Sequence, residues 1–389
     1  MLLTIIIFFL VLGLVVLVHE AGHFFVARIL GVKVEEFGFG FPPRLVGFYK
    51  NEENKIKWVW GAKFAAEAAP HTVYSLNKIP IGGFVKIKGE DGSYESDKDS
   101  FITKKPWQKA AVLTAGVLGN FLLCVVLFSI GFYIGLPTAL DDKQTQHLKE
   151  IKNSAIQVVS INVNSPAETA GIKIGDVILA LDDKDVQEVK AIQDYTAQKN
   201  NLIVNVRVKR SDDFLNLEVV PTVLESSNGK AVMGVGLVHT ATISYGLWGA
   251  IWQGLTNTFS LIGAICWAFF ELIKNIFTTG QVSADLSGPV GILMMTGQVT
   301  QLGWIYVLQF VALLSINLGI INILPFPALD GGRIVFVIIE KIRGRGIDRK
   351  IENIIHTVGY VCLLVLIVMV TYRDVARWGG VLINKIFNL

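Results

Sequence analysis

A run of apolar residues from Met1 to Ala27 is interrupted by three ionisable side chains, His19, Glu20 and His23. The run is long enough to enter a lipid bilayer, where an ionisable side chain is costly and therefore marks a functional site. His19 and His23 are four positions apart, so a helix places both imidazoles on one face. Such a pair can bind one zinc ion, and the glutamate after the first histidine can act as a general base.

The alternative is a chance match to a short motif whose residues are satisfied core side chains. The apolar surroundings weaken that alternative, because no water is available in lipid to solvate an unpaired charge. We therefore interpret His19 and His23 as metal ligands and Glu20 as the catalytic base.

The composition indicates a multi-pass membrane protein. A chain of 389 residues with 52% hydrophobic and 17% charged residues is too apolar for an ordinary soluble protein. The net charge of +3 gives no support for nucleic acid as a partner. Cys124, Cys266 and Cys362 are far apart in apolar stretches, which favours buried thiols over a disulfide framework or a thiolate zinc site.

The first apolar run lacks the basic start of a signal peptide, so we predict a retained transmembrane helix over 1–28. Many lysines and arginines follow in 29–109, and such residues mark the cytoplasmic side. The N-terminus is then predicted to be extracytoplasmic, with the two histidines near the inner face.

Short strands are predicted within 29–109, at Gly38–Phe48 and Ile79–Glu90, from apolar residues flanked by glycine turns. This cytoplasmic or membrane-reentrant β region could offer an edge strand to an extended substrate. A plain cytoplasmic hairpin explains the pattern equally well. The candidate substrate-binding residues of this edge are Gly83, Phe84, Val85 and Lys86.

A second transmembrane helix is predicted over 110–136. Its small residues Ala115, Gly116 and Gly119 permit close helix contact, and Asn120 is interpreted as an interhelical hydrogen-bonding residue. After a linker at 137–155, residues 156–224 predict a strand, a short helix, a strand, a helix and two strands.

The sequence SPAETAGIKIGDVI at 165–178 resembles PDZ domains of bacterial envelope proteases. PDZ domains bind a peptide or a protein C-terminus by strand addition. A size filter or docking platform is an equal alternative for this section.

Residues 225–304 are predicted to form interfacial amphipathic helices. Tyr245–Phe277 is long enough for a further span, but its polar residues share one helical stripe and its tryptophans suit a headgroup boundary. The remaining predicted segments are a third helix at 305–332, a cytoplasmic loop at 333–354, a fourth helix at 355–372 and a tail at 373–389.

The number of spans decides where Asp330 lies. With four spans, Asp330 reaches the same membrane face as His19, next to a second basic cluster. A fifth span at Tyr245–Phe277 would place it at the opposite face. The sequence thus predicts a polytopic α-helical membrane protein with four transmembrane helices, an inserted α/β PDZ domain and a membrane-associated β-hairpin sheet.

Asp330 is predicted as the third metal ligand, because catalytic zinc usually has three protein ligands and a water. Pro325 and Pro327 break the helix before it, which a membrane tolerates only where the chain lines an enclosed cavity. A turn or helix cap is the alternative for Asp330. Asn322 could orient substrate or stabilise an oxyanion, or cap the freed helix end.

These motifs together resemble the site-2 protease family of intramembrane zinc metalloproteases, in its bacterial RseP-like branch. The resemblance is carried in order by HEAGH, GGFVKIKGE, WQKAAVLTAGVLGNF, the PDZ section, LSGPVGI at 286–292 and NILPFPALDGG at 322–332. Some relatives have two PDZ domains where this chain has one, and many have histidine where this chain has Arg333.

The resemblance implies an enzyme of the bacterial cytoplasmic membrane that cleaves single-span proteins within the lipid bilayer. Its substrates would be anti-sigma factors after a first cut and remnant signal peptides. Zn²⁺ would be bound by His19, His23 and Asp330, Glu20 would be the base, and Asn322 and the 79–90 hairpin would hold substrate. Both termini and the PDZ section would be extracytoplasmic, with the active site towards the cytoplasm.

Two other functions are considered. A non-enzymatic scaffold would use the PDZ section to dock partners and the histidines as a structural metal site. A metal transporter is disfavoured, because the chain shows no repeated halves and its candidate ligands converge at one depth.

Overall fold

The computed structural model describes residues 2–387 except 91, 140–151, 163–164, 211–212, 225–226, 228, 280–287 and 345. The chain divides into two compact units, which are described separately. Unit 1 comprises residues 1–129, 253–299 and 307–389, and unit 2 comprises 130–252 and 300–306. The motif at 286–292 lies partly outside the described residues.

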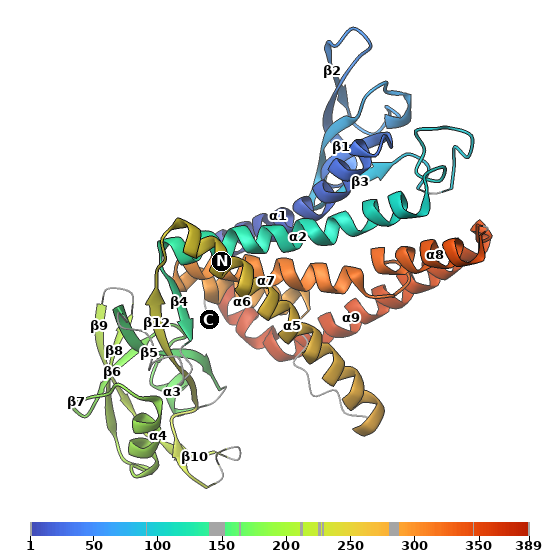
Figure 1. Cartoon of the computed structure of the whole chain (residues 1–389). Coiled ribbons are helices and arrows are strands. Elements are labelled where there is room, and N and C mark those ends of the chain that lie inside the picture. The colour runs from blue at the N-terminus through green and yellow to red at the C-terminus, as the bar shows by residue number, and fades with distance from the viewer. Residues whose placement is uncertain are drawn as a thin grey trace. The chain divides into compact units, whose positions relative to one another are not determined.

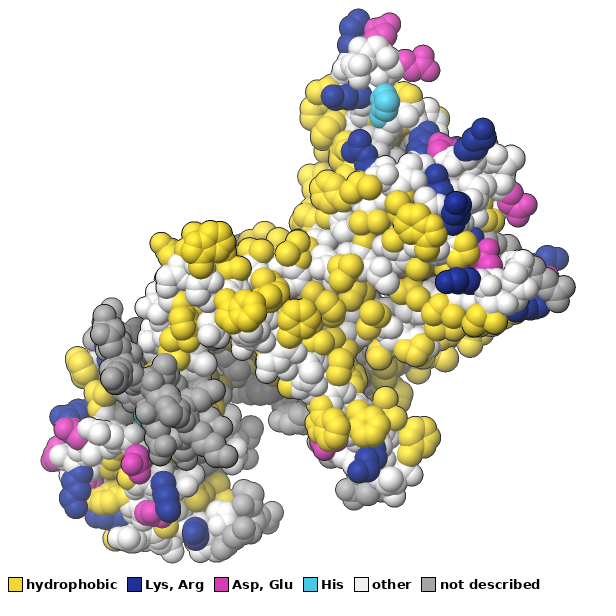
Figure 2. Space-filling view, viewed as in Figure 1, with side chains coloured by type: hydrophobic (Ala, Val, Ile, Leu, Met, Phe, Trp, Pro, Cys, Tyr) yellow, Lys and Arg dark blue, Asp and Glu magenta, His cyan; other side chains and the backbone are white. Residues whose placement is uncertain are grey.

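Long helices dominate unit 1 (Figure 1). They are α1 (Leu2–Ile29), α2 (Pro106–Ile134), α5 (Leu247–Thr279), α6 (Pro289–Leu302), α7 (Trp304–Ile323), α8 (Asp330–Arg343) and α9 (Arg349–Phe387). Among the described residues, five helical segments are long and apolar enough to cross a membrane: α1, α2, residues 247–278 of α5, α7 and residues 350–376 of α9. Hydrophobic side chains cover much of the visible helix surface (Figure 2). The chain is therefore a multi-pass membrane protein.

The predicted count of four spans is not confirmed. Residues 247–279 form one continuous helix, α5, rather than several interfacial helices. Its best window has a mean hydropathy of 1.5, the lowest of the five candidates, because of its polar stripe. That window is nevertheless apolar enough to qualify as a span.

The packing of α5 and α2 shows where α5 begins. On α2, Gly116 packs against His19, and Ser129 lies about 20 Å further along the helix. Gly254 near the start of α5 packs against Ser129. The start of α5 therefore lies at the end of the bundle remote from His19.

The start of α6 lies at that same remote end. On α9, Gly359 packs against Pro327, close in sequence to Asp330, and Asp374 lies about 22 Å further along. The Asp374 carboxylate accepts the Gly291 N–H at the start of α6 (2.7 Å). Since α5 and α6 both start remote from His19, the chain makes no net crossing between these two starts. Asp330 therefore lies beside His19 even though residues 247–279 form a helix long enough to be a fifth span. The prediction that a fifth span would place Asp330 at the opposite face is wrong.

A three-stranded antiparallel sheet lies beside the C-terminal part of α1 (Figure 1). Its strands are β1 (Val34–Lys50), β2 (Ile56–Trp60) and β3 (Val73–Ile87), in the order β2-β1-β3, with a 3-10 turn at Ala66–Ala68. A cluster including Phe24, Val34, Ile87 and Val112 holds the sheet against α1 and α2. The predicted strands are present, and β3 is an edge strand.

Unit 2 is an α/β domain built on a seven-stranded sheet. Its elements are β4 (Leu136–Ala139), β5 (Lys152–Ile161), α3 (Pro166–Thr169), β6 (Val177–Leu181), β7 (Lys184–Asp185), α4 (Val189–Ala197), β8 (Val204–Arg210), β9 (Asp213–Val219), β10 (Thr222–Val223), β11 (Ala231–Val232) and β12 (Val235–Ile243). The sheet order is β4-β12-β5-β6-β8-β9, with β7 paired to β6, while β10 and β11 form a separate pair.

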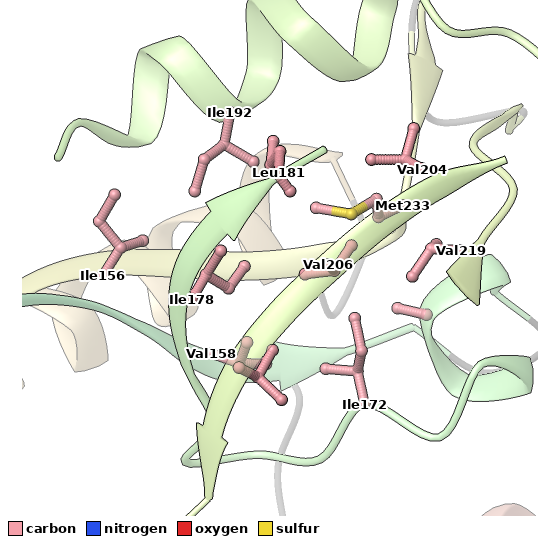
Figure 3. Close-up of a cluster of buried hydrophobic side chains, with 12 residues drawn as sticks. Ile156, Val158, Ile172, Ile178, Leu181, Ile192, Val204, Val206, Val219 and Met233 are labelled. Atoms are coloured by element: carbon pink, nitrogen blue, oxygen red, sulfur yellow. The ribbon is translucent and has the colours of Figure 1, made fainter. Parts of the chain in front are cut away.

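The element order predicted for the PDZ section is confirmed as β5, α3, β6, α4, β8 and β9. The alternating residues Val204, Val206 and Val208 belong to one core, which they share with Ile178 and Ile192. Figure 3 shows Val204 and Val206 within this core. The sheet continues beyond 156–224, because β12 pairs with both β4 and β5.

Candidate metal centre

Three predicted ligands from two distant segments meet in unit 1. His19 and His23 lie on α1, and Asp330 is the first residue of α8. The Asp330 Oδ2 atom lies 3.0 Å from His19 Nε2 and 3.3 Å from His23 Nε2. The two Nε2 atoms are 3.2 Å apart. Both histidines are buried.

This triangle fits a zinc ion. Tetrahedral zinc with bonds of about 2.0–2.1 Å holds its ligand atoms about 3.3 Å apart. Two imidazole nitrogens and one carboxylate oxygen form a donor set of catalytic zinc, which leaves a fourth position for water or substrate. Among the described residues, His19, His23 and Asp330 form a group whose ligand atoms lie close enough together to hold one metal ion.

The break between α7 and α8 brings Asp330 to the histidines. The prolines at 325 and 327 supply no backbone N–H for helix continuation. After the break, the chain turns back tightly onto the end of α7. A Cβ on Gly331 would lie 2.2 Å from the backbone oxygens of Ile323 and Leu324, so the turn requires glycine there.

Each imidazole is oriented through its other nitrogen. His23 Nδ1 donates to the Val112 carbonyl (2.8 Å), which leaves Nε2 available to a metal. The Asn120 amide lies 3.3 Å from His19 Nδ1. Asn120 is fully buried, and its Oδ1 has no hydrogen-bond partner within the described residues. Turning this amide by 180° lets Oδ1 accept the Nδ1 proton of a metal-binding His19.

We expect Asn120→Ala to weaken zinc binding about 10- to 100-fold, because His19 loses the group that orients its ring. Asn120→Asp retains an acceptor and should recover most of the affinity. Competition with a chromogenic zinc chelator measures both variants. Equal affinity in Asn120→Ala and the parent chain would contradict the orienting role.

Gly116 forms the wall of the centre on α2. A Cβ at this position would lie 2.4 Å from His23 Nε2 and 2.8 Å from His19 Nε2. The interpretation of Gly116 from the sequence, as a small residue that permits close helix contact, is therefore incomplete. Its spacing from Asn120, one helical turn, was the available signal that both residues share a face.

Gly116→Ala should reduce zinc affinity about 100-fold, because the methyl group occupies the position beside both ligand nitrogens. Gly263→Ala is the matched control, since nothing lies within 4 Å of a Cβ at Gly263 on α5. Zinc retention during dialysis against a chelator distinguishes the two. Similar retention in both variants would show that Gly116 leaves room for a side chain.

Glu20 and Asn322 both lie at the centre. The Glu20 Oε2 atom accepts the backbone N–H of Val85 on β3 (3.0 Å). The Asn322 Nδ2 atom lies 3.1 Å from His19 Nε2, the nitrogen that faces Asp330. The predicted base, ligands, amide and edge strand are therefore brought together.

The β3 edge borders a cavity of about 390 Å³ whose lining includes Phe84, Val85, Lys86 and Arg333. Gly83 is outside this lining and packs near Leu17 of α1. Lys86 forms ion pairs with Glu67 and with Glu35, so its charge is already engaged. Burial raises the pKa of Glu35, against the opposing effect of the Lys86 ammonium. Arg333 pairs with Glu90, which joins α8 to the turn after β3.

Comparisons with known proteins show the family of the chain. The model of peptidase family M50 matches residues 7–58 and 53–366. A protein of Agrobacterium fabrum, named as a candidate zinc metalloprotease, is 32% identical over 397 residues, covering 96% of each chain. The regulator of sigma-W protease RasP of Bacillus subtilis is 28% identical over 456 residues, covering 96% of this chain and 98% of that protein.

One solved structure is similar to a smaller part of the chain. The PDZ domain of an SdrC-like protein from Listeria monocytogenes is 20% identical, with a TM-score of 0.21, and covers 23% of this chain and 92% of that one. The family match extends over most of the sequence and includes His19, His23 and Asp330. The chain therefore belongs to peptidase family M50, the family of intramembrane zinc metalloproteases.

Proposed function

We propose that this zinc metalloprotease binds its ion through His19, His23 and Asp330 and cleaves peptide bonds in membrane-spanning substrates with Glu20 as the base. The observation that carries this proposal is the triangle of three ligand atoms, 3.0–3.3 Å apart, beside the Glu20 carboxylate. A structural metal site needs no base, so the neighbouring glutamate favours the enzyme over the scaffold.

Zinc, when bound, supplies a Lewis acid that polarises a carbonyl and acidifies water. Glu20 takes the proton of the attacking water and returns it to the leaving amine. The Asn322 amide donates a hydrogen bond that holds the substrate backbone beside His19. Arg333 holds β3 near the centre through Glu90.

A helical substrate must unwind before its carbonyl is accessible, because helical carbonyls are already hydrogen-bonded. The free edge of β3 can replace those lost bonds by strand addition. Its Val85 N–H is donated to Glu20 in this structure. A carbonyl of an added substrate strand would accept the hydrogen bond from that N–H and free the Glu20 carboxylate to act as base. Substrate docking would thereby be coupled to catalysis.

Val85→Pro should slow cleavage of a transmembrane reporter about tenfold while zinc content stays at one per chain, because proline removes one N–H from the edge. Val85→Ala keeps the N–H and serves as the control. An initial-rate assay in proteoliposomes gives both values. A rate unchanged by proline would count against strand pairing at β3.

The proposed substrates are single-span membrane proteins, including anti-sigma factors after a first cut and remnant signal peptides. The name of the Bacillus subtilis relative, a regulator of sigma-W protease, supports this class. Basic residues after α1 and around α8 support a site facing the cytoplasm of a bacterial cytoplasmic membrane. The termini and the PDZ-like unit 2 would then be extracytoplasmic, where unit 2 binds a peptide terminus or limits substrate size.

The test is cleavage of a purified single-span reporter by the full chain in proteoliposomes. Metal chelation should abolish the product, and added Zn²⁺ should restore it. Product formation that survives complete zinc removal would refute the zinc-dependent mechanism. A zinc-loaded chain that cleaves no single-span reporter would favour the scaffold.

A further inference from the structure

A basic cavity lies where α1 ends and the sheet of unit 1 begins. Its volume is about 530 Å³. Its lining includes the basic side chains Arg28, Lys33, Lys50 and His71, and none of the described residues that line it is a carboxylate. Arg28 is in the last turn of α1, so the cavity opens at the end of the first membrane-spanning helix.

Lys33 interacts electrostatically with Glu35 and Asp99, so the uncompensated positive charge of this cavity is that of Arg28 and Lys50. Within the described residues, neither Arg28 nor Lys50 has an acidic partner within 4 Å. Arg28 lies 5.3 Å from the centre of the Phe24 ring, and its Nη1 donates a long hydrogen bond to the Tyr74 hydroxyl (3.4 Å). Lys33 donates to the Ala69 carbonyl (2.9 Å). An anion is therefore the complementary ligand.

An apolar cavity of about 410 Å³ adjoins the basic one, and the two share Phe48 and Tyr74. The remaining residues of its lining are Leu17, Phe37, Phe39, Val46, Gly47, Trp58, Ser75 and Leu76. Leu17 belongs to the membrane-spanning part of α1, two residues before His19. Figure 2 shows basic and hydrophobic side chains side by side over the β1–β3 sheet.

We propose that the two cavities form one binding site for an anionic phospholipid. The phosphate pairs with Arg28 and Lys50, and an acyl chain lies against Phe48 and Trp58. A free phosphate would use only the basic part, whereas a lipid matches both parts and their order along α1. Exposed tryptophans on β2, Trp58 and Trp60, are typical of the headgroup boundary.

The proposed lipid site does not depend on the roles proposed above for the metal ligands and for Glu20. Tyr74 is in β3, the strand whose later residues reach Glu20, so a bound lipid contacts the strand that borders the metal centre. Lipid occupancy would therefore stabilise the position of the sheet against α1. Anionic lipids concentrated in the cytoplasmic leaflet would favour the sheet at that face.

The experiment uses quenching of Trp58 by brominated acyl chains. The full chain is reconstituted in phosphatidylcholine vesicles that contain increasing fractions of brominated phosphatidylglycerol or brominated phosphatidylcholine. Subtracting the fluorescence of the Trp58→Phe variant isolates the contribution of Trp58. We expect the phosphatidylglycerol to quench Trp58 at a lower fraction than the phosphatidylcholine.

Arg28→Gln combined with Lys50→Gln should weaken that preference by about 25-fold, or roughly fivefold for each charge near an anionic lipid. Lys57→Gln combined with Lys63→Gln is the control, because these exposed lysines lie in the same region outside both cavities. Unchanged zinc content confirms that the variants fold.

Three outcomes would overturn the proposal. The first is equal quenching by the two lipids in the parent chain. The second is the same loss of preference in both double variants. The third is displacement of the lipid effect by millimolar glycerol phosphate, which would assign the basic cavity to a soluble phosphate.

Discussion

Glu20→Gln is expected to reduce cleavage of a single-span reporter about a thousandfold while leaving one zinc ion bound per chain. Glutamine retains the size of glutamate and an oxygen that can accept the Val85 N–H, so the β3 contact survives. It cannot take a proton from water, and general base catalysis typically contributes 10²–10⁴ in rate. Single-turnover cleavage and metal analysis of the same sample give both quantities.

Glu53→Gln is the matched control for this substitution. Glu53 pairs with Lys55 on the exposed turn between β1 and β2, away from the metal ligands. Its variant should cleave at the parental rate. Full activity in Glu20→Gln would refute the base assignment, and loss of zinc in that variant would instead make Glu20 part of the metal site.

Asp330→Asn is expected to lower zinc affinity at least about 100-fold and to abolish cleavage. Two imidazoles remain, but the substitution removes the anionic oxygen that lies 3.0 Å and 3.3 Å from them. Zinc stabilises the folded chain by RT ln(1 + c/Kd) at a free zinc concentration c, so a weaker affinity should also shrink the rise in Tm at a fixed zinc concentration. Chelator competition and thermal unfolding measure these effects.

Asp374→Asn provides a matched change at a second buried carboxylate. Asp374 accepts the Gly291 N–H at the start of α6, remote from His19, so this variant should bind zinc like the parent chain. If Asp330→Asn binds zinc with parental affinity, a ligand other than Asp330 completes the site. If both variants lose zinc equally, the loss reflects general destabilisation.

The candidate ligands His19 and His23 were predictable from the sequence for a local reason. A helix converts the spacing of His19 and His23 into one shared face, and an apolar segment makes their presence costly without a function. The roles of Gly116 and Asn120 were not predictable in the same way. A small residue and an amide on a membrane helix suit any helix contact, and only the neighbouring side chains show which contact they make.

Whether α5 spans the membrane or lies at its surface could not be predicted from its own residues either. Its composition is compatible with a membrane span and with an interfacial helix. The prediction that a fifth span here would separate Asp330 from His19 counted this helix alone and is wrong. The contacts of Gly254 with Ser129 and of Gly291 with Asp374 show that α5 and α6 start at the same end of the bundle.

The sequence by itself determined the class of protein, the donor types and the PDZ-like order of elements, because hydropathy, helical period and strand alternation are local properties. Tertiary structure decided that residues 19 and 330 meet, that Gly116 leaves room for them, and that β3 reaches Glu20. These facts depend on helix packing between distant segments, and packing distances are set by the neighbours of a residue rather than by its own type.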